Sequence, residues 1–287
     1  MPLNLQTFKT RALTAVVFVL VMLVGLLWNQ WSFLVLFSVI HFGCWIEYLR
    51  LVEKIDPAYK NVSGAHRYSI MLAGYGLMLC MTDSTYSISG YTLQDAGCWM
   101  KRIFGLIFLL VVIFSLKKNP LKLAAHSVLG FIYISVSCGC MMQLWGNMEH
   151  RVFEGRDWVM PVVLIASIWI NDTMAYIVGS FIGKTPFSPV SPKKTWEGTI
   201  GGALLAVIAV TLGGMYGFGF PVKALLLISV IAAIAGTGGD LFESKLKRLA
   251  GVKDSGNIMP GHGGFLDRFD SLLVATTVTW LVFHFLY

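Results

Sequence analysis

The chain has 287 residues, of which 56% are hydrophobic and only 13% are charged, and its mean hydropathy is +0.71. An ordinary soluble domain carries about 25% charged residues, so this composition excludes a soluble fold of the same length. The net charge is +7, but the basic residues follow the connections between apolar runs. We therefore interpret this charge as a topology signal and expect no nucleic-acid partner.

The apolar runs predict an all-α polytopic membrane protein with about nine transmembrane helices. The first run follows Lys9 and Arg11 and has no small-residue cleavage site before Trp28, so we expect it to be retained. The expected spans cover roughly residues 12–28, 32–49, 68–82, 103–116, 123–143, 158–182, 199–218, 223–244 and 270–287.

No soluble domain separates these spans, so we expect one integrated membrane domain. Residues 1–150 are interpreted as a transmembrane scaffold and residues 151–287 as the catalytic region. Between the third and fourth spans, residues 83–102 are expected to form a polar outer loop.

Lysine and arginine residues are distributed unequally between alternate connections. One side of the membrane receives Lys101, Arg102, Arg151, Arg156 and Lys223, and the other 17 of the 22 basic residues fall on the side of the N-terminus. By the positive-inside rule, this asymmetry predicts a cytoplasmic N-terminus.

Five cysteines are present, four of them in apolar runs and Cys98 in the outer loop. Cys138 and Cys140 have no further ligands at metal-binding spacing, and we interpret the cysteines as small buried hydrophobes.

Two polar stretches interrupt the apolar pattern between residues 168 and 200. Asp172 lies inside the expected sixth span, where a carboxylate is costly unless it faces protein, water or a cation. The second stretch is the basic loop Ser191–Gly198, in which Ser191 is expected to cap the next helix and Pro192 to occupy its first turn. A helix N-terminus beside Lys193 and Lys194 would form an anion site, although a positive-inside loop explains the paired lysines equally well.

The third polar stretch is the longest and runs from Gly236 to Asp270. Its glycine cluster, Gly236–Gly239, is expected to weaken the helix and to let other groups approach the backbone. Four polar residues then recur on one helical face: Asp240, Glu243, Ser244 and Lys247. Asp267 and Asp270 share a face if the last helix starts nearby.

Crowded carboxylates stay ionised together only when a cation neutralises them, and oxygen ligands beside lysine and arginine suit Mg²⁺ and a phosphate. Helix rise places Asp172 and Asp240 at similar depths in the cytoplasmic half of the membrane. The residues therefore predict a metal–phosphate site that opens to the cytoplasm. A solvated interfacial ion-pair cluster remains the alternative for residues 267–270, and a simple turn residue for His262.

The run from Ser244 to Asp270 resembles the signature of the phosphatidate cytidylyltransferases, also called CDP-diacylglycerol synthases. It contains Lys247-Arg248, Lys253-Asp254, His262-Gly263-Gly264 and Asp267-Arg268-Phe269-Asp270. Ser191–Gly198 and Gly239–Ser244 are similar to the other two blocks of that family in order and spacing. The matching blocks extend over residues 169–270.

This resemblance implies a nucleotidyltransferase that converts phosphatidate and CTP into CDP-diacylglycerol and pyrophosphate for phospholipid synthesis. It implies metal binding by Asp240, Asp267 and Asp270, with Mg²⁺ as the cofactor and a second cation such as K⁺ left open. It assigns Lys193, Lys194, Lys247, Arg248 and Lys253 to the phosphates. Further substrate-site candidates are Ser191, Thr195, Ser244, Asp172, Glu197, Asp254 and His262. The resemblance also implies a homodimer, and the short loops favour a bacterial inner membrane.

Three competing functions remain at the level of the sequence. A CTP-dependent polyprenol kinase would need a similar site but would release CDP, and a cytidylyltransferase could act on another lipid phosphate. A secondary transporter would place Asp172 and Asp240 at a coupling-ion site reachable from both sides. A CDP-alcohol phosphotransferase is disfavoured, because its Asp-Gly-x₂-Ala-Arg block is missing from the sequence.

Overall fold

A computed structural model describes residues 5–115, 119–146, 152–153, 156–258 and 263–286, with side chains from residue 13 onward. Arg151 and His262, named above, lie outside the described residues, as do Lys117 and Lys118 of the basic residues expected on the side of the N-terminus and the side chains of Lys9 and Arg11. The chain divides into two compact units. The first comprises Met1–Met142 and Leu249–Phe269, and the second comprises Gln143–Arg248 and Asp270–Tyr287.

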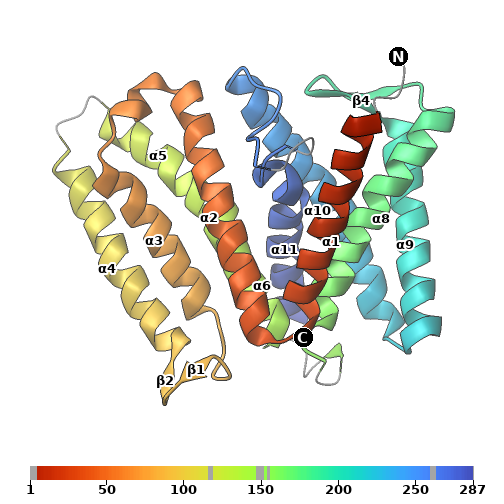
Figure 1. Cartoon of the computed structure of the whole chain (residues 1–287), viewed down its shortest axis with the longest axis horizontal. Coiled ribbons are helices and arrows are strands. Elements are labelled where there is room, and N and C mark those ends of the chain that lie inside the picture. Colours follow the sequence, from red (N-terminus) through yellow and green to blue (C-terminus); the bar gives the residue numbers. More distant parts are fainter. Residues whose placement is uncertain (1–4, 116–118, 147–151, 154–155, 259–262, 287) are drawn as a thin grey trace. The chain divides into compact units, whose positions relative to one another are not determined.

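The first unit is built mainly from helices that lie side by side (Figure 1). Its elements are α1 (Leu5–Leu27), α2 (Gln30–Ile55), the 3₁₀ helix η1 (Pro57–Asn61), α3 (Gly64–Cys80), β1 (Ser87–Ile88), β2 (Tyr91–Thr92), α4 (Leu93–Ile113), α5 (Pro120–Gly130), the π-helical segment η2 (Phe131–Val136) and most of α6 (Ser137–Gly146). Strands β1 and β2 form an antiparallel hairpin between α3 and α4.

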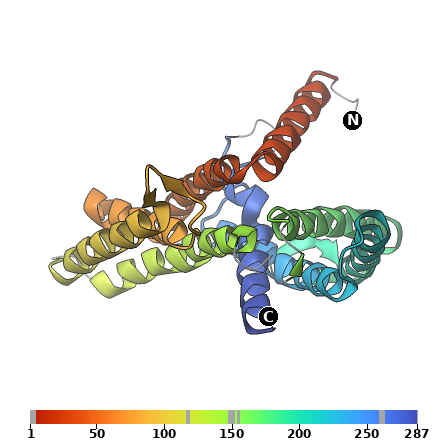
Figure 2. The same cartoon turned by 90° about the horizontal axis from the view of Figure 1, so that it is seen from below.

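The second unit holds four long helices and one hairpin. Its elements are α8 (Val159–Ile182), β3 (Pro186–Ser188), β4 (Ser191–Thr195), α9 (Trp196–Phe218), α10 (Val222–Leu249, up to Arg248) and α11 (Leu266–Leu286, from Asp270). Figure 2 shows α8, α9 and α10 grouped together. Strands β3 and β4 pair antiparallel, with Pro186 opposite Thr195 and Ser188 opposite Ser191.

The all-α membrane class is confirmed in its coarse form. Seven helical segments of the described chain are long and apolar enough to cross a bilayer: Gln30–Ile55, Leu93–Ile113, Pro120–Gly146, Val159–Ile182, Trp196–Phe218, Val222–Leu249 and Leu266–Leu286. The two other expected spans correspond to α1, with an apolar part at Leu13–Leu27, and to α3, which has 17 residues.

The expected outer loop at 83–102 was partly wrong, because α4 begins at Leu93. Thr92 caps this helix: its hydroxyl accepts a hydrogen bond from the Asp95 backbone N–H at 3.2 Å. A polar first turn is invisible to a hydropathy window, so the start of the helix was placed too late.

Close packing between α8 and α9 depends on small residues. A Cβ atom at Gly202 would lie 2.4 Å from the backbone nitrogen of Ala175, and one at Gly198 would lie 2.8 Å from the Ala175 carbonyl oxygen. Small residues allow helix backbones to approach closely where lipid provides no hydrophobic drive for association. This contact fixes the end of α8 against the start of α9, where the basic hairpin β3–β4 connects them.

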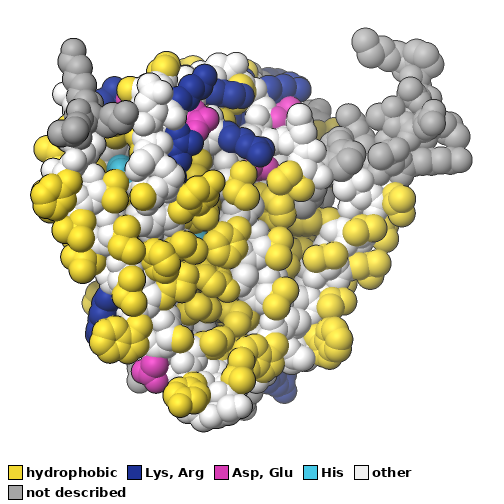
Figure 3. All heavy atoms as spheres, turned by 60° about the vertical axis from the view of Figure 1, so that its left-hand side comes forward, with side chains coloured by type: hydrophobic (Ala, Val, Ile, Leu, Met, Phe, Trp, Pro, Cys, Tyr) yellow, Lys and Arg dark blue, Asp and Glu magenta, His cyan; other side chains and the backbone are white. Residues whose placement is uncertain are grey.

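Hydrophobic side chains dominate the surface of the described chain. They form a broad area on the face drawn in Figure 3, with acidic and basic side chains gathered toward its ends. In the 18-residue window of α4, only 11% of the residues are buried within the protein. An apolar surface of this extent requires lipid contact, because soluble proteins rarely expose large contiguous apolar patches.

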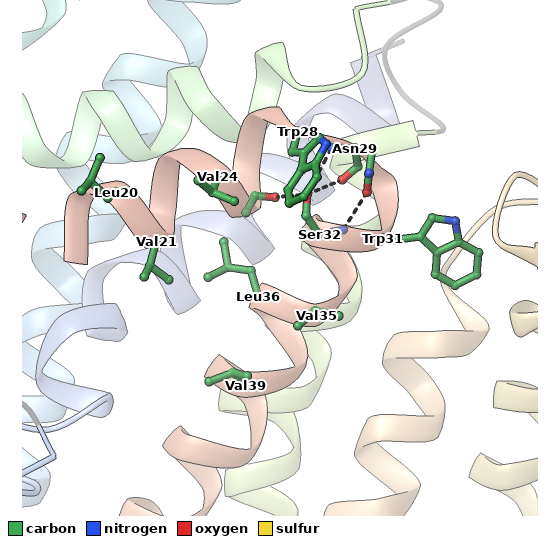
Figure 4. Close-up of a pocket in the computed structure, with 11 residues that line it drawn as sticks. Leu20, Val21, Val24, Trp28, Asn29, Trp31, Ser32, Val35, Leu36 and Val39 are labelled. Atoms are coloured by element: carbon green, nitrogen blue, oxygen red, sulfur yellow. Dashed lines mark hydrogen bonds between the residues drawn. The ribbon is translucent and has the colours of Figure 1, made fainter. Parts of the chain in front are cut away.

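A cavity of about 640 Å³ lies between α1 and α2 (Figure 4). Its walls are mainly aliphatic, including Leu20, Val24 and Val39, and none of its lining residues is charged. The polar groups at its end satisfy one another, since the Ser32 backbone N–H donates to Asn29 Oδ1 at 2.9 Å. The cavity therefore lacks the charge that a phosphate or a metal would need.

The cysteine prediction was wrong for two residues. Cys80 at the end of α3 and Cys98 in α4 form a disulfide across 18 residues of sequence. Cys44, Cys138 and Cys140 are buried thiols, as expected. Hydropathy placed Cys80 in a span and Cys98 in a loop, and only the early start of α4 brings their backbones together.

We predict that alkylation of the unfolded, unreduced protein labels three cysteines, and that reduction raises the number to five. Cys98→Ser should lower the free energy of unfolding by about 2–4 kcal/mol, because the disulfide restricts the unfolded chain. Mass spectrometry of the labelled protein measures the thiol count. Labelling of all five cysteines before reduction would contradict the disulfide.

Candidate functional site

Three carboxylates converge where α10 passes the beginning of α11 in the second unit. Asp270 interacts electrostatically with Asp240 and Glu243, and its side chain is hydrogen-bonded to that of Asp240. Asp270 is 8% exposed and Glu243 is fully buried. Gly239 makes the approach possible, since a Cβ atom there would lie 2.4 Å from the Asp270 carbonyl oxygen. The glycine cluster thus admits a neighbouring backbone as predicted, but α10 runs through it without a break.

Two lysines and a fourth carboxylate complete this group, which we call the acidic cluster: Asp172, Lys194, Asp240, Glu243, Lys247 and Asp270. The Lys194 ammonium forms a salt bridge with Asp240 Oδ2. Asp172 on α8 interacts electrostatically with both Lys194 and Asp240. Lys247 Nζ lies 2.5 Å from Glu243 Oε2, one helical turn away.

The acidic cluster has an excess of negative charge when all its members are ionised. Four carboxylates face two ammonium groups. Neighbouring carboxylates oppose each other's ionisation unless another cation is present. The cluster is therefore electrostatically prepared to accept a cation.

The carboxylates of the acidic cluster suit a magnesium ion that also takes water and phosphate oxygens as ligands. Although Asp240, Glu243 and Asp270 interact, no group of three His, Cys, Asp or Glu side chains among the residues that the structure describes is arranged to hold one metal ion. Asp240 and Asp270 do adjoin each other, and Mg²⁺ is commonly held by one or two carboxylates together with water and substrate phosphates. A pair of carboxylates is thus sufficient for an ion that arrives with its phosphate ligand.

The basic loop differs from its predicted local structure. Ser191–Thr195 forms β4, and α9 begins at Trp196, so Ser191 does not cap this helix and Pro192 is not in its first turn. Thr195 is the cap: its hydroxyl accepts from the Gly198 backbone N–H at 3.2 Å. Pairing with β3 holds the segment extended, which overrides the capping preference of an isolated Ser-Pro pair.

Glu197 occupies the first turn of α9 and holds the loop before β3. Its carboxylate accepts hydrogen bonds from the Lys184 and Thr185 backbone N–H groups at 3.1 Å and from the Thr185 hydroxyl at 2.8 Å. These bonds engage the carboxylate with its own hairpin. Through them Glu197 holds the start of β3 to the first turn of the helix that follows β4, the strand that carries Lys193 and Lys194.

Other predicted residues lie at the edges of these groups. Lys193 is exposed on β4, and Ser244 is half-buried on α10. Arg248 is exposed, with its Nε 3.5 Å from the Val190 carbonyl oxygen. Lys253 and Asp254 are exposed in the first unit.

Asp267 also belongs to the first unit, and its Oδ2 is surrounded by donors. It accepts from the backbone N–H groups of Ser255 and Gly264 at 2.9 and 2.8 Å, and lies 2.9 Å from the Ser255 hydroxyl. Asp267 and Asp270 lie three residues apart on α11, which begins at Leu266 rather than near residue 270.

One residue that the sequence reasoning missed is Glu47. It lies in α2, is completely buried, and is hydrogen-bonded to Ser255, Phe265 and Leu266. The available signal was a carboxylate inside the apolar run Trp45–Tyr48, the same signal that identified Asp172. Treating the N-terminal half as scaffold left this signal unused.

Fold and site together define an integral membrane protein with an acidic, lysine-paired cluster among its C-terminal helices. The family model of the cytidylyltransferase family matches residues 9–286. The chain is 33% identical to the phosphatidate cytidylyltransferase of Staphylococcus saprophyticus over 277 residues, covering 92% of this chain and 95% of that protein. It is 34% identical to the protein of the same name from Staphylococcus aureus strain COL over 275 residues, with the same coverage of both chains. This chain belongs to the cytidylyltransferase family.

Proposed function

We propose that the chain transfers CMP from CTP to phosphatidate, forming CDP-diacylglycerol and pyrophosphate. The observation that carries this proposal is the match of nearly the whole chain to proteins named for that activity. The acidic cluster supplies a chemical basis, because it combines carboxylates that suit a metal with lysines that suit phosphates.

The reaction requires positioning and charge neutralisation more than proton transfer. A phosphatidate oxygen attacks the α-phosphorus of CTP, a new P–O bond forms, and the bond to the β-phosphate oxygen breaks as pyrophosphate leaves. The attacking oxygen is already largely ionised, so the site needs no strong base. Lys194 and Lys247, which pair with carboxylates of the acidic cluster, would stabilise the phosphate charge that develops during this exchange.

We assign metal binding to Asp240 and Asp270 in the second unit, and to Asp267 in the first. When bound, Mg²⁺ would supply Lewis-acid neutralisation of the phosphate oxygens. The roles of the exposed bases Lys193, Arg248 and Lys253 in binding CTP or lipid phosphate, a second cation such as K⁺, and a homodimer remain predictions.

We also propose that the acidic cluster opens to the cytoplasm of a bacterial cell, at its inner membrane. The distribution of basic residues supports this orientation. The disulfide adds an independent argument, because it joins α3 to α4 on the side predicted to be outside, where oxidising conditions favour disulfides. Asp172 lies 13 residues after the start of α8 at Val159 and ten before its end at Ile182, so it is slightly nearer the end of the helix that is predicted to be cytoplasmic.

The experiment that tests the function is pyrophosphate release by the detergent-purified protein with CTP, phosphatidate and Mg²⁺, omitting each in turn. Release that requires all three, together with formation of CDP-diacylglycerol, is the expected result. CDP formed with a polyprenol would instead indicate a lipid kinase. Absence of turnover with every lipid phosphate, together with cysteine probes at positions 172 and 240 labelled from outside, would favour a transporter.

Asp270→Asn should lower kcat by at least about two orders of magnitude, because loss of a metal ligand removes transition-state charge stabilisation. The amide retains a carbonyl acceptor for the Ser271 backbone N–H, which lies 2.6 Å from Asp270 Oδ1, so the protein should remain folded in the membrane. Initial rates at saturating CTP and Mg²⁺ measure the effect. A kcat close to that of the unmodified protein would refute the metal assignment of Asp270.

Lys194→Ala should raise the KM for CTP by about tenfold to hundredfold, since a charge-assisted hydrogen bond to phosphate is lost. Lys245→Ala is the matched control, because it removes an exposed ammonium group from α10, the helix that carries Asp240 and Lys247. Steady-state kinetics of both variants, with melting temperatures, separate binding from folding. Equal KM values for CTP in the two variants would show that Lys194 does not bind phosphate and acts only as a positive charge that sets the membrane topology.

A further inference from the structure

A buried carboxylate of the first unit organises the segment that leads into α11. Glu47 Oε1 accepts from the Phe265 backbone N–H at 3.0 Å, and Oε2 accepts from that of Leu266 at 2.9 Å. The first N–H groups of a helix have no partner within the helix, and a negative charge there is favourable. Glu47 therefore acts as a cap for α11 that comes from α2.

Glycines shape the backbone around this carboxylate. A Cβ atom at Gly256 would lie 2.1 Å from Glu47 Oε1, and one at Gly264 would lie 2.2 Å from Oε2. A side chain at either position would require the segment or the hydrogen-bonded Glu47 carboxylate to move. The sequence of this segment is thus fitted to a carboxylate that lies more than 200 residues earlier in the chain.

Ser255 connects Glu47 to Asp267. Its hydroxyl lies 2.7 Å from Glu47 Oε2 and 2.9 Å from Asp267 Oδ2, and it accepts from the Asp267 backbone N–H at 3.3 Å. Gly263, at φ +83°, passes close to the same carboxylate, because a Cβ atom there would lie 2.7 Å from Asp267 Oδ2. The position of Asp267 thus depends on a hydroxyl that is anchored to Glu47.

We propose that Glu47 is a positioning residue that orients the Asp267 carboxylate through Ser255, so that the N-terminal half contributes to cation binding. This inference rests on the proposed function for its kinetic consequences. The alternative is a structural role alone, in which Glu47 holds α2 to the start of α11 without affecting Asp267. The two differ because only the positioning role links Glu47 to the response to Mg²⁺.

Glu47→Gln and Ser255→Ala are the informative variants. Glutamine keeps the shape of the side chain but has one acceptor oxygen in place of two, so it cannot present a separate oxygen to each backbone N–H group. Alanine at position 255 removes only the bridging hydroxyl. Each variant should raise the Mg²⁺ concentration for half-maximal activity by about tenfold or more, as expected when a group that orients a ligand is lost. High Mg²⁺ should restore part of the rate.

Glu53→Gln is the matched control on α2, because Glu53 pairs with Arg67 and lies outside the segment that leads into α11. It should leave the Mg²⁺ dependence unchanged even if it lowers the melting temperature. If Glu47→Gln and Ser255→Ala reduce activity only in proportion to their folded fraction, with unchanged Mg²⁺ dependence, the positioning role is overturned.

A readout without turnover separates this inference from the proposed function. Mg²⁺ should raise the melting temperature of the unmodified protein, and both variants should lose most of this increase. If the unmodified protein is inactive but shows this pattern, the function fails and the positioning role stands. If Mg²⁺ neither supports activity nor changes the melting temperature, cation binding by Asp267 is refuted and the positioning role falls with it.

Discussion

The structure depends on how carboxylates are accommodated within helices that are otherwise apolar. An ionised side chain at such a position is costly unless charges or hydrogen-bond donors compensate it. The second unit compensates Asp240 and Glu243 with the ammonium groups of Lys194 and Lys247. The first unit compensates Glu47 with backbone N–H groups and a hydroxyl. These two forms of compensation determine which segments of the chain must come into contact. Gly239, Gly256 and Gly264 lie at positions where this contact is close enough to favour a residue without a side chain.

Hydropathy and charge were sufficient to predict the helical class and the convergence of Asp172 with Asp240. Both signals are local: a long apolar run has one stable solution in a bilayer, and a carboxylate within it needs a partner at similar depth. Pairing between distant segments could not be predicted in the same way. The extended form of Ser191–Thr195 depends on β3, and the disulfide depends on a helix start set by Thr92.

The omission of Glu47 has a different origin. Its carboxylate carried the same signal as Asp172, but it lay in the N-terminal half, which was interpreted as scaffold. Its partners are backbone N–H groups and one serine, which a reading of charged residues cannot identify. Motif analysis therefore misses a site formed partly from main-chain donors, although Gly256 and Gly264, which follow Ser255 and precede Phe265, are sites of close approach to Glu47.

The pairing of Lys194 with Asp240 suits a site whose substrate brings both signs of charge. Before substrate binds, each group compensates the other, so neither charge is left without a partner in an apolar region. On the proposed function, Lys194 would pair with a phosphate and Asp240 would hold the cation that accompanies it. Each group would then exchange one opposite charge for another, so that charge compensation would be maintained. A lysine suits this exchange because its ammonium group is a compact charge on a flexible stem, whereas the planar fork of an arginine would hold a carboxylate in a fixed bidentate geometry.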